Sequence, residues 1–270
     1  MKKIIALLLV LTMALGLAAC GGSAADTTAD TAADAAAETP AYFADLQTPG
    51  KIVIATSPDY PPYESYDAAG NIVGFDIDAI NEVIKILNED YAVEAEWVPM
   101  DFSTIISAVQ SGQADIGVSC FTYEPEREGQ VLFSDAYLKS AQVAVVKADS
   151  DMTTIDDLAG KTIGAGSGTT GESAASEIEG TTVTSMGDYV QMFEILKNGG
   201  LDAVVCDEAV GQNYASQDGY KLLDGKLVDE EVSVITATDS TELVSALNAA
   251  IAKFVASDKY TELKTTWGLN

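Results

Sequence analysis

The chain has 270 residues, and its 42 acidic and 14 basic side chains give it a formal net charge of −28 at pH 7. Such a negative charge argues against nucleic acid as a partner, because phosphates would be repelled. The sequence has no histidine, which excludes Ser-His and Cys-His catalysis and zinc sites with an imidazole ligand. With only three cysteines as well, we expect no metal and no cofactor.

The amino-terminal segment has the composition of an export signal followed by a tether. Residues 1–19 combine two lysines, a long apolar run and small residues before Cys20, which is typical of a secretory signal peptide. Small residues that end at a cysteine resemble the bacterial lipobox, which implies a lipoprotein signal peptide and a lipid on Cys20. The alternative is a plain signal peptide with a chance cysteine. Residues 20–48, mostly Ala, Thr and Asp, hold too little apolar surface to fold and are expected to form a flexible acidic tether.

From residue 51 onward, strand and helix patterns alternate, which predicts an α/β fold with mixed, mostly parallel sheets flanked by helices. In the first half we expect strands at 51–56, 93–99 and 114–119 and helices at 76–87 and 102–111, the second capped by Asp101. In the second half we expect strands at 142–147, 161–166, 182–186 and 201–207, helices at 154–158, 189–197 and 208–216, and one more helix before the third strand. Two further amphipathic helices are expected at 241–256 and 260–267.

Arg127 and Thr122 are candidate anion ligands, because they follow the apolar strand 114–119 and we expect both in the loop beyond it. In open α/β sheets, ligands bind outside the carboxyl ends of the strands. The planar guanidinium of arginine matches a carboxylate with two parallel hydrogen bonds, which a lysine cannot do. The alternative for a lone arginine at such a place is a surface ion pair.

Residues 166–171 match the dinucleotide-binding pattern G-x-G-x-x-G. The pattern alone is weak, and it lies in the second half of the fold rather than at its start. Its glycines leave backbone N–H groups accessible at a helix start, and these attract any anion. We therefore interpret this loop as an anion-binding segment and not as a dinucleotide site.

Several motifs, in one order and spacing, resemble those of the family 3 extracellular solute-binding proteins, the amino-acid receptors of bacterial ABC importers. They are YPPY (60–63), GFDID (74–78), the pair Asp101-Phe102, T-x-x-P-E-R (122–127), FSDAY (133–137), GSGTTGE (166–172) and LDAVVCD (201–207). The resemblance implies a two-lobed, type II periplasmic-binding-protein-like fold. It implies lobe 1 at 49–138 plus 233–270, lobe 2 at 142–228, and hinge strands near 137–141 and 229–232.

The same resemblance implies roles for individual residues. Arg127, Thr122 and Thr170 would hold the ligand's α-carboxylate, and Asp207 its α-ammonium. Tyr60 and Phe102 match the aromatic pair that encloses the ligand's side chain. Two alternatives stay open, since Asp207 could cap the helix that follows it and Phe102 could be an ordinary core residue. The rest of the predicted ligand-binding set is Ser57, Asp59, Ser119, Cys120 and Thr169.

The sequence departs from the family pattern at three positions. Ser57 stands where many members have an aspartate that reaches the ligand's side chain, and Asp59 could substitute for it. Cys120 stands where small residues are usual, and Glu124 replaces a small hydroxyl residue and is expected to be solvated. Cys120 and Cys206 are either two buried thiols or a pair that bonds when the lobes close.

These features predict a receptor rather than an enzyme. We expect a monomer, lipid-anchored at the outer face of the cell membrane, that passes one polar or basic L-amino acid to an ABC permease and its ATPase. Arginine, lysine and glutamine are the candidate ligands. The alternatives are an enzyme resembling the cyclohexadienyl dehydratases, with Glu172 or Asp207 as the acid or base, and a sensing or adhesion module.

Overall fold

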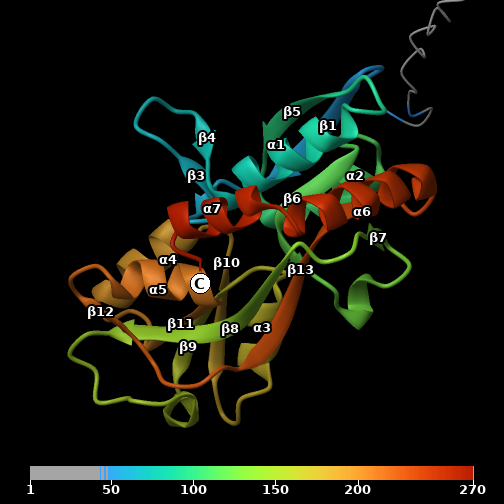
Figure 1. The fold of residues 1–270 in the computed structure, drawn as a ribbon. Helices are drawn as coiled ribbons and strands as arrows, with labels where there is room; N and C mark the ends of the chain where they lie inside the picture. Colours follow the sequence, from blue (N-terminus) through green and yellow to red (C-terminus); the bar gives the residue numbers. More distant parts are fainter. Residues whose placement is uncertain (1–42, 44–45, 47, 270) are drawn as a thin grey trace, which may run out of the picture. The chain divides into compact units, whose positions relative to one another are not determined.

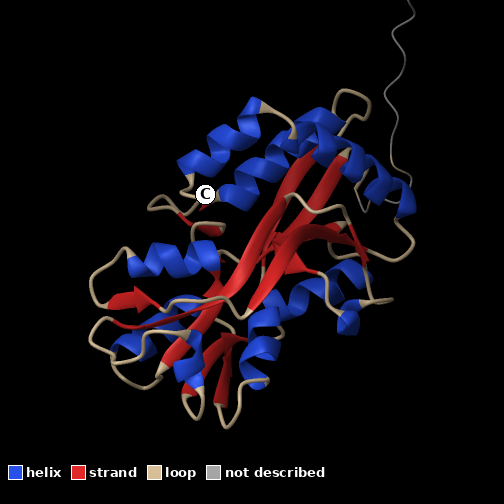
Figure 2. Ribbon diagram, turned by 60° about the horizontal axis from the view of Figure 1, so that its bottom comes forward, coloured by secondary structure: helices blue, strands red, loops and turns tan. Residues whose placement is uncertain are grey.

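A single mixed sheet of ten strands forms the centre of the protein (Figure 1). The computed structural model describes residues 43, 46 and 48–269, all within the compact unit Thr39–Asn270. The strand order of the ten-stranded sheet is β10-β9-β11-β8-β13-β6-β1-β5, while β12 pairs with β8 and β7 with β13. Helices gather around the two ends of this sheet and leave its middle to two long strands (Figure 2).

One end of the sheet is built from parallel strands of the first half of the chain. These strands are β1 (Lys51–Thr56), β5 (Glu94–Pro99) and β6 (Ile116–Thr122). The helices around them are α1 (Phe75–Leu87), α2 (Phe102–Gln110), α6 (Thr241–Val255) and α7 (Asp258–Thr266). All residues of β6 and all but the first of β1 are buried, as expected for central strands covered on both faces. A small separate sheet comprises β2 (Asp59–Tyr60), β3 (Glu64–Tyr66) and β4 (Ile72–Val73).

The other end of the sheet is built from parallel strands of the second half. These are β9 (Thr162–Gly166), β10 (Thr182–Met186) and β11 (Ala203–Asp207). The associated elements are η2 (Ile155–Leu158), α3 (Thr170–Ser176), α4 (Tyr189–Lys197), α5 (Glu208–Ala215) and β12 (Tyr220–Leu222). Gly211 lets α5 approach the sheet, because a Cβ there would lie 2.8 Å from a Val143 methyl.

Two long antiparallel strands, β8 (Leu138–Lys147) and β13 (Val228–Thr236), connect the two ends. On the outer sides β8 pairs with β11 and β13 pairs with β6, also antiparallel. Two short elements, η1 (Pro125–Arg127) and β7 (Leu132–Phe133), lie between β6 and β8 in the chain. The sheet is therefore parallel at its two ends and antiparallel in its middle.

Most helices and the parallel strands agree with the sequence prediction, whereas β13 extends well beyond the hinge strand expected at 229–232 and the shortest strands were not predicted. Strand β10 and helix α4 have the predicted bounds. Thr122, expected in a loop, is instead the last residue of β6. Asp101 occupies the N-cap position of α2, but its side chain makes no capping hydrogen bond. Strands β2, β3, β4, β7 and β12 are two or three residues long, too short to produce a periodic pattern.

Phe43 extends the packed body into the segment expected to be a tether. Its ring stacks on Tyr91 with centroids 4.1 Å apart, and the residue is 5% exposed. Leu46 packs against the same core. An aromatic ring gains free energy by leaving water, so the folded part begins no later than Phe43. The expected signal peptide at 1–19 and the lipid-bearing Cys20 lie outside the described residues, and within the described part no helix is long and apolar enough to cross a membrane.

Candidate ligand-binding site

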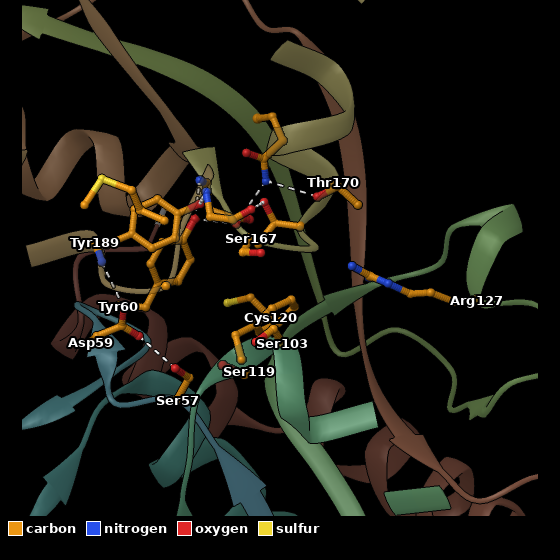
Figure 3. Close-up of a pocket in the computed structure, with 17 residues that line it drawn as sticks. Ser57, Asp59, Tyr60, Ser103, Ser119, Cys120, Arg127, Ser167, Thr170 and Tyr189 are labelled. Carbon is orange, nitrogen blue, oxygen red and sulfur yellow. Dashed lines mark hydrogen bonds between the residues drawn. The ribbon is translucent and has the colours of Figure 1, made fainter. Parts of the chain in front are cut away.

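An enclosed cavity lies where β2, β6, α2, the β9–α3 turn and β11 meet (Figure 3). All predicted ligand-binding residues except Thr122 line it. The lining residues that sequence reasoning missed are Ser103, Gln142, Gly166, Ser167, Met186, Gly187 and Tyr189. The cavity measures about 40 Å³, room for only a few water molecules, so a larger ligand has to displace contacts between the lining groups.

Arg127 is buried and held by oxygen atoms on both sides of the cavity. Its Nη1 donates to the Thr122 carbonyl oxygen at 2.6 Å, and its Nη2 donates to the Gly168 carbonyl oxygen at 2.9 Å. The guanidinium carbon also lies 5.9 Å from the centroid of the Phe102 ring, within reach of a cation–π interaction. Burial lowers the pKa of this guanidinium, opposed by the charge of Glu124. The structure thus supports a buried cation at the cavity wall and not the surface ion pair considered as an alternative.

Thr122 and Glu124 differ from their expected roles. Thr122 reaches Arg127 only through its backbone oxygen, and its own hydroxyl is buried without a hydrogen-bond partner. Glu124, expected to be solvated, forms an ion pair with Arg127 at 3.0 Å and accepts a hydrogen bond from Ser173 at 3.0 Å. The expectation for Glu124 was wrong because the three-residue turn of η1 brings its carboxylate back over the guanidinium.

Thr169 and Thr170 begin helix α3 at the edge of the cavity. Thr169 is the N-cap, and its hydroxyl accepts from the Glu172 backbone N–H at 3.2 Å. The preceding Gly168 has φ +74°, a conformation that other residues adopt only with strain. The N–H groups in the first turn of a helix lack helical acceptors, so this turn offers donors to an anion. Glu172 turns back to accept from the Gly168 N–H at 2.7 Å.

Asp207 is the most heavily hydrogen-bonded acid in the cavity. The Ser140 hydroxyl donates to its Oδ1 at 2.6 Å, and the Tyr60 hydroxyl donates to its Oδ2 at 2.8 Å. The amide of Gln142 also donates to Oδ2, at 3.1 Å. Burial raises the pKa of Asp207. Although Asp207 holds the N-cap position of α5, its side chain makes no capping hydrogen bond, which removes the alternative role.

Three aromatic residues line the cavity. Tyr60 is 7% exposed, and its ring centroid lies 4.5 Å from that of Tyr189. Phe102 stacks on Phe121 at 4.7 Å, so it packs in the core and also faces the cavity. Tyr189 was not predicted as a site residue, although its position next to Asp188 at the start of a predicted helix places it at an element end, where site residues are common.

Ser57 and Asp59 form a hydrogen-bonded pair that reaches the opposite side of the cavity. The Ser57 hydroxyl donates to Asp59 Oδ1 at 2.9 Å, and the Tyr189 backbone N–H donates to Asp59 Oδ2 at 3.0 Å. Asp59, on β2, thus accepts from the first residue of α4. Burial raises the pKa of this carboxyl. The acid that could substitute for Ser57 is present at the cavity, but both of its oxygens are already used.

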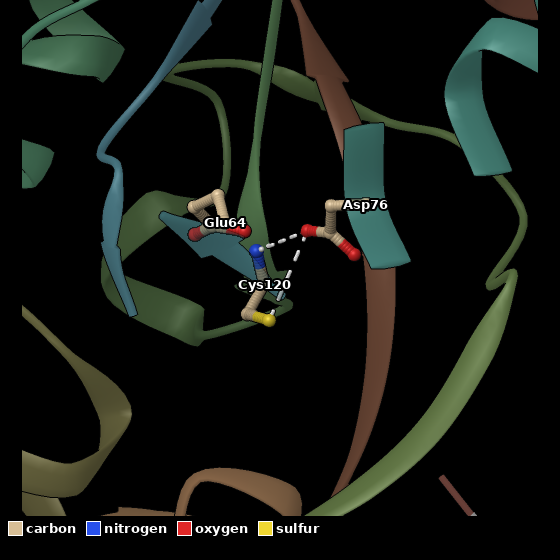
Figure 4. Close-up of side chains that lie close together, drawn as sticks. All are labelled: Glu64, Asp76 and Cys120. Carbon is tan, nitrogen blue, oxygen red and sulfur yellow. Dashed lines mark hydrogen bonds between the residues drawn. The ribbon is translucent and has the colours of Figure 1, made fainter. Parts of the chain in front are cut away.

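Ser119 and Cys120 contact two buried acids, Glu64 and Asp76. Figure 4 shows both acids beside Cys120. The Ser119 hydroxyl donates to Glu64 at 2.6 Å, and the Cys120 backbone N–H donates to Asp76 at 3.1 Å. Burial raises the pKa of both carboxyls, that of Asp76 to about 6, while their mutual hydrogen bond raises the pKa of Glu64 and lowers that of Asp76. The shared proton therefore belongs to Glu64.

This cluster has three potential metal ligands, one each from Glu64, Asp76 and Cys120, within 4.8 Å of one another. A metal ligand must be deprotonated, however, and burial also raises the pKa of the Cys120 thiol. Hydrogen bonding accounts for the cluster better than a metal does. Cys120 adopts φ +49°, and both it and Cys206 are free, buried thiols.

Comparison with known proteins identifies the family. Residues 52–270 match the model of the bacterial extracellular solute-binding proteins, family 3. The arginine-binding extracellular protein ArtP of Bacillus subtilis (strain 168) is 31% identical over 224 residues, which cover 80% of this chain and 86% of that protein. Among solved structures, the substrate binding protein of an amino acid ABC transporter has a TM-score of 0.75 and 36% identity, covering 81% of this chain and 99% of that one. An ancestral arginine-binding protein bound to glutamine has a TM-score of 0.75 and 32% identity, covering 82% of this chain and 99% of that one.

These relatives are named as binding proteins and not as enzymes. The structural neighbours have the two-lobed type II fold, and the sheet described above, parallel at both ends and crossed by two antiparallel strands, agrees with it. The predicted fold class is thereby confirmed. The chain belongs to the bacterial extracellular solute-binding proteins of family 3.

Proposed function

We propose that this protein binds one polar or basic L-amino acid in the cavity and delivers it to the permease of an ABC importer. The observation that carries the proposal is that one buried guanidinium, Arg127, and one buried carboxylate, Asp207, line the same cavity. A zwitterion stripped of its water needs both an anion-binding and a cation-binding group.

The contacts that now close the cavity indicate how a ligand would enter it. The ligand's carboxylate would take the place of the Gly168 carbonyl and of Glu124 at Arg127, and would gain donors from the first turn of α3. Its ammonium would take the place of the Tyr60 hydroxyl at Asp207. Arg127 and Asp207 each keep a polar partner in these exchanges, and the displaced Glu124 keeps the hydrogen bond from Ser173.

The two charged groups lie on opposite lobes in our proposed division, with lobe 1 at 49–138 plus 233–270 and lobe 2 at 142–228. Strands β8 and β13 would provide the hinge, near 137–141 and 229–232. The ligand then shifts the population toward the closed state, because only in that state do Arg127 and Asp207 reach the same molecule.

Arginine, lysine and glutamine are the proposed ligands. The similar proteins named above are an arginine-binding protein and an ancestral arginine-binding protein bound to glutamine. The three aromatic rings and the acid Asp59 in this cavity suit a long polar or cationic side chain. The proposal also includes a monomer anchored by a lipid on Cys20 at the outer face of the membrane, with the permease and its ATPase as partners.

A thermal-shift screen against the twenty amino acids tests this function. A ligand at 100 times its dissociation constant stabilises the protein by about 2.7 kcal/mol, which raises the melting temperature by several degrees. We expect a shift with at least one of arginine, lysine and glutamine, and none with their carboxylate-free amine analogues. No shift with any amino acid would overturn the proposal.

A further inference from the structure

Three neighbouring strands in the middle of the sheet bring a second carboxyl group next to Asp207. In the antiparallel register, Asp207 of β11 is opposite Gln142 of β8. Two residues along β8, Ser140 is opposite Glu230 of β13. Because side chains alternate along a strand, Ser140 and Gln142 point to the same face of the sheet as Asp207 and Glu230.

Gln142 links the two acids. Its Nε2 lies 3.1 Å from Asp207 Oδ2 and 2.9 Å from Glu230 Oε2. The three side chains are almost fully buried, at 2%, 4% and 4% exposure for Gln142, Asp207 and Glu230. Two further oxygens in this group, Gln142 Oε1 and Glu230 Oε1, are buried and have no hydrogen-bond partner. Gln142 lines the cavity, so the linked pair extends from the ligand site into the hinge strands.

The position of Gln142 depends on a glycine across from it. A Cβ at Gly171 would lie 2.6 Å from Gln142 Oε1, closer than a side chain tolerates. Gly171 therefore leaves the space in which the amide can reach both acids. The unpartnered oxygen of this amide is an acceptor at the cavity wall and fits an N–H donor.

The pair has too little positive charge around it to keep both acids ionised. On the Asp207 side the neighbouring titratable groups are Tyr60, Tyr63, Asp76, Tyr189 and Cys206. Burial raises the pKa of each of these tyrosines and of this thiol, so they stay neutral. On the Glu230 side the neighbouring titratable groups are Cys120 and Arg127. The Cys120 thiol is also neutral, and Arg127 is already paired with the carboxylate of Glu124.

Two like charges in such surroundings cannot both persist, so one acid keeps a proton. Burial, and then the charge of Asp207, raises the pKa of Glu230 to about 8. A hydrogen bond between the two carboxyls raises the pKa of Glu230 further and lowers that of Asp207. The proton therefore belongs to Glu230 and the negative charge to Asp207.

We infer that Glu230 and Asp207 share one proton in the ligand-free protein, and that the ammonium group of a bound ligand displaces this proton into solvent. The inference rests on the proposed function, since it assigns the proton count of the same ammonium subsite. Glu230 changes from a carboxylic acid to a carboxylate, its proton passes to the buffer, and the ligand's positive charge replaces it. Glu230 is a positioning residue, because it lies behind Gln142 and does not line the cavity.

Calorimetric titration of the full chain with L-arginine, in phosphate and in Tris at the same pH, counts the protons released. With a pKa of about 8 in the free protein, up to about 0.9 proton per ligand leaves near pH 7. The affinity should then rise by as much as tenfold per pH unit and level off above about pH 8. If the wild-type protein releases no proton when L-arginine binds, the inference is overturned by this measurement alone.

The decisive variant is Glu230→Gln, which keeps the shape of the protonated acid but has no proton to release. We expect it to bind L-arginine with no proton release and a flat pH profile. Glu231→Gln is the matched control, because Glu231 is the next residue on β13 and its side chain is 69% exposed. The control should behave as the wild type does, and equal proton release in all three proteins would contradict the inference.

A measurement without ligand separates this inference from the proposed function. Carbon-13 NMR of labelled glutamate carboxyls, from about pH 3 to 10, should show one resonance that titrates near 8 and that Glu230→Gln lacks. Titration of that resonance near the usual glutamate value of about 4.3 would overturn the proton sharing even if amino acids bind. If arginine, lysine and glutamine all fail to bind, the proposed function is wrong, and so is the displacement of the proton by a ligand. The NMR titration still decides whether Glu230 and Asp207 share a proton.

Discussion

Arg127 is the residue on which ligand affinity should depend most. Replacing Arg127 by alanine removes both hydrogen bonds to the ligand's carboxylate, and the carboxylate is then buried without a cation. This should weaken the binding free energy by about 2 to 5 kcal/mol, which is roughly a thirty-fold to several-thousand-fold loss of affinity. Calorimetry with arginine, lysine or glutamine measures the loss. Lys139→Ala is the control, because that side chain is 87% exposed and should not affect binding. Unchanged affinity in Arg127→Ala would refute the site.

Glu124 should act as an internal competitor of the ligand. Its carboxylate occupies the Nη2 of Arg127, so a ligand must displace it. We expect Glu124→Gln to bind the ligand about three- to ten-fold more tightly, since a charged hydrogen bond is exchanged for a neutral one. Ser173→Ala, which removes the other partner of Glu124, should change affinity by less than about twofold. Weaker binding in Glu124→Gln would mean that the acid helps to close the cavity instead.

At the scale of single elements, Gly74 fixes the start of α1 and the small sheet beside it. It has φ +150°, and a Cβ there would lie 1.8 Å from the Tyr63 carbonyl oxygen. We expect Gly74→Ala to destabilise the protein by at least about 3 kcal/mol, because backbone atoms must move apart. That shift would also disturb Tyr60 and Glu64, which flank the same turn.

Gly70→Ala is the matched control for Gly74→Ala in urea unfolding. Gly70 also has a positive φ, +86°, but a Cβ there would meet nothing within 4 Å. Its substitution should cost only the strain of the left-handed conformation, about 1 to 2 kcal/mol. Equal losses in the two variants would show that steric contact at Gly74 is not the cause.

The accuracy of the predicted elements did not follow their length, since the nine-residue strand β13 was expected only as a hinge strand at 229–232. Helix α4 and the five-residue strand β10 were predicted to the residue, because Asp188 and neighbouring glycines mark their boundaries. The antiparallel pairing of β8 with β13 was not predictable from alternation, since residues distant in the chain form it.

The same limit applies to the site. Arg127, Asp207 and Thr170 were recognised through motifs, whereas Gln142 lies in the interior of a strand and gains its partners only from the register of β8 with β11. Gly166 and Ser167 lie in the glycine-rich segment that was interpreted as anion-binding but were not named as site residues, and Gly187 belongs to a bend that only the tertiary fold brings to the cavity.

At the scale of the whole molecule, the described residues include two buried pairs of acids: Glu64 on β3 with Asp76 on α1, and Asp207 on β11 with Glu230 on β13. The pKa of every one of these four carboxyls is raised above its ordinary value, chiefly by burial. A raised folded-state pKa favours the folded state fully below the unfolded pKa, near 4, and this stabilisation is lost as the pH rises through the folded value.

The melting temperature of the ligand-free protein should therefore fall as the pH rises from about 5 to beyond 8, the range set by pKa values of about 6 for Asp76 and about 8 for Glu230. Glu230 alone can account for a few kcal/mol of this loss. Scanning calorimetry measures the melting temperature at each pH, and Glu230→Gln should make its decrease less steep at the upper end of this pH range. Repulsion among the many surface acids would give a similar trend, but salt screens it and does not screen the buried pairs. A slope abolished by salt would contradict the prediction.

The stacking of Phe43 on Tyr91 would limit the distance between the cavity and the membrane in a lipid-anchored form of the protein. If Cys20 carries the lipid, the covalent path from the bilayer surface to the first packed residue is the stretch between positions 20 and 43. Fully drawn out, this stretch spans at most about 80 Å, whatever conformation it adopts. A protein anchored in this way would keep its folded part within about 80 Å of the membrane surface.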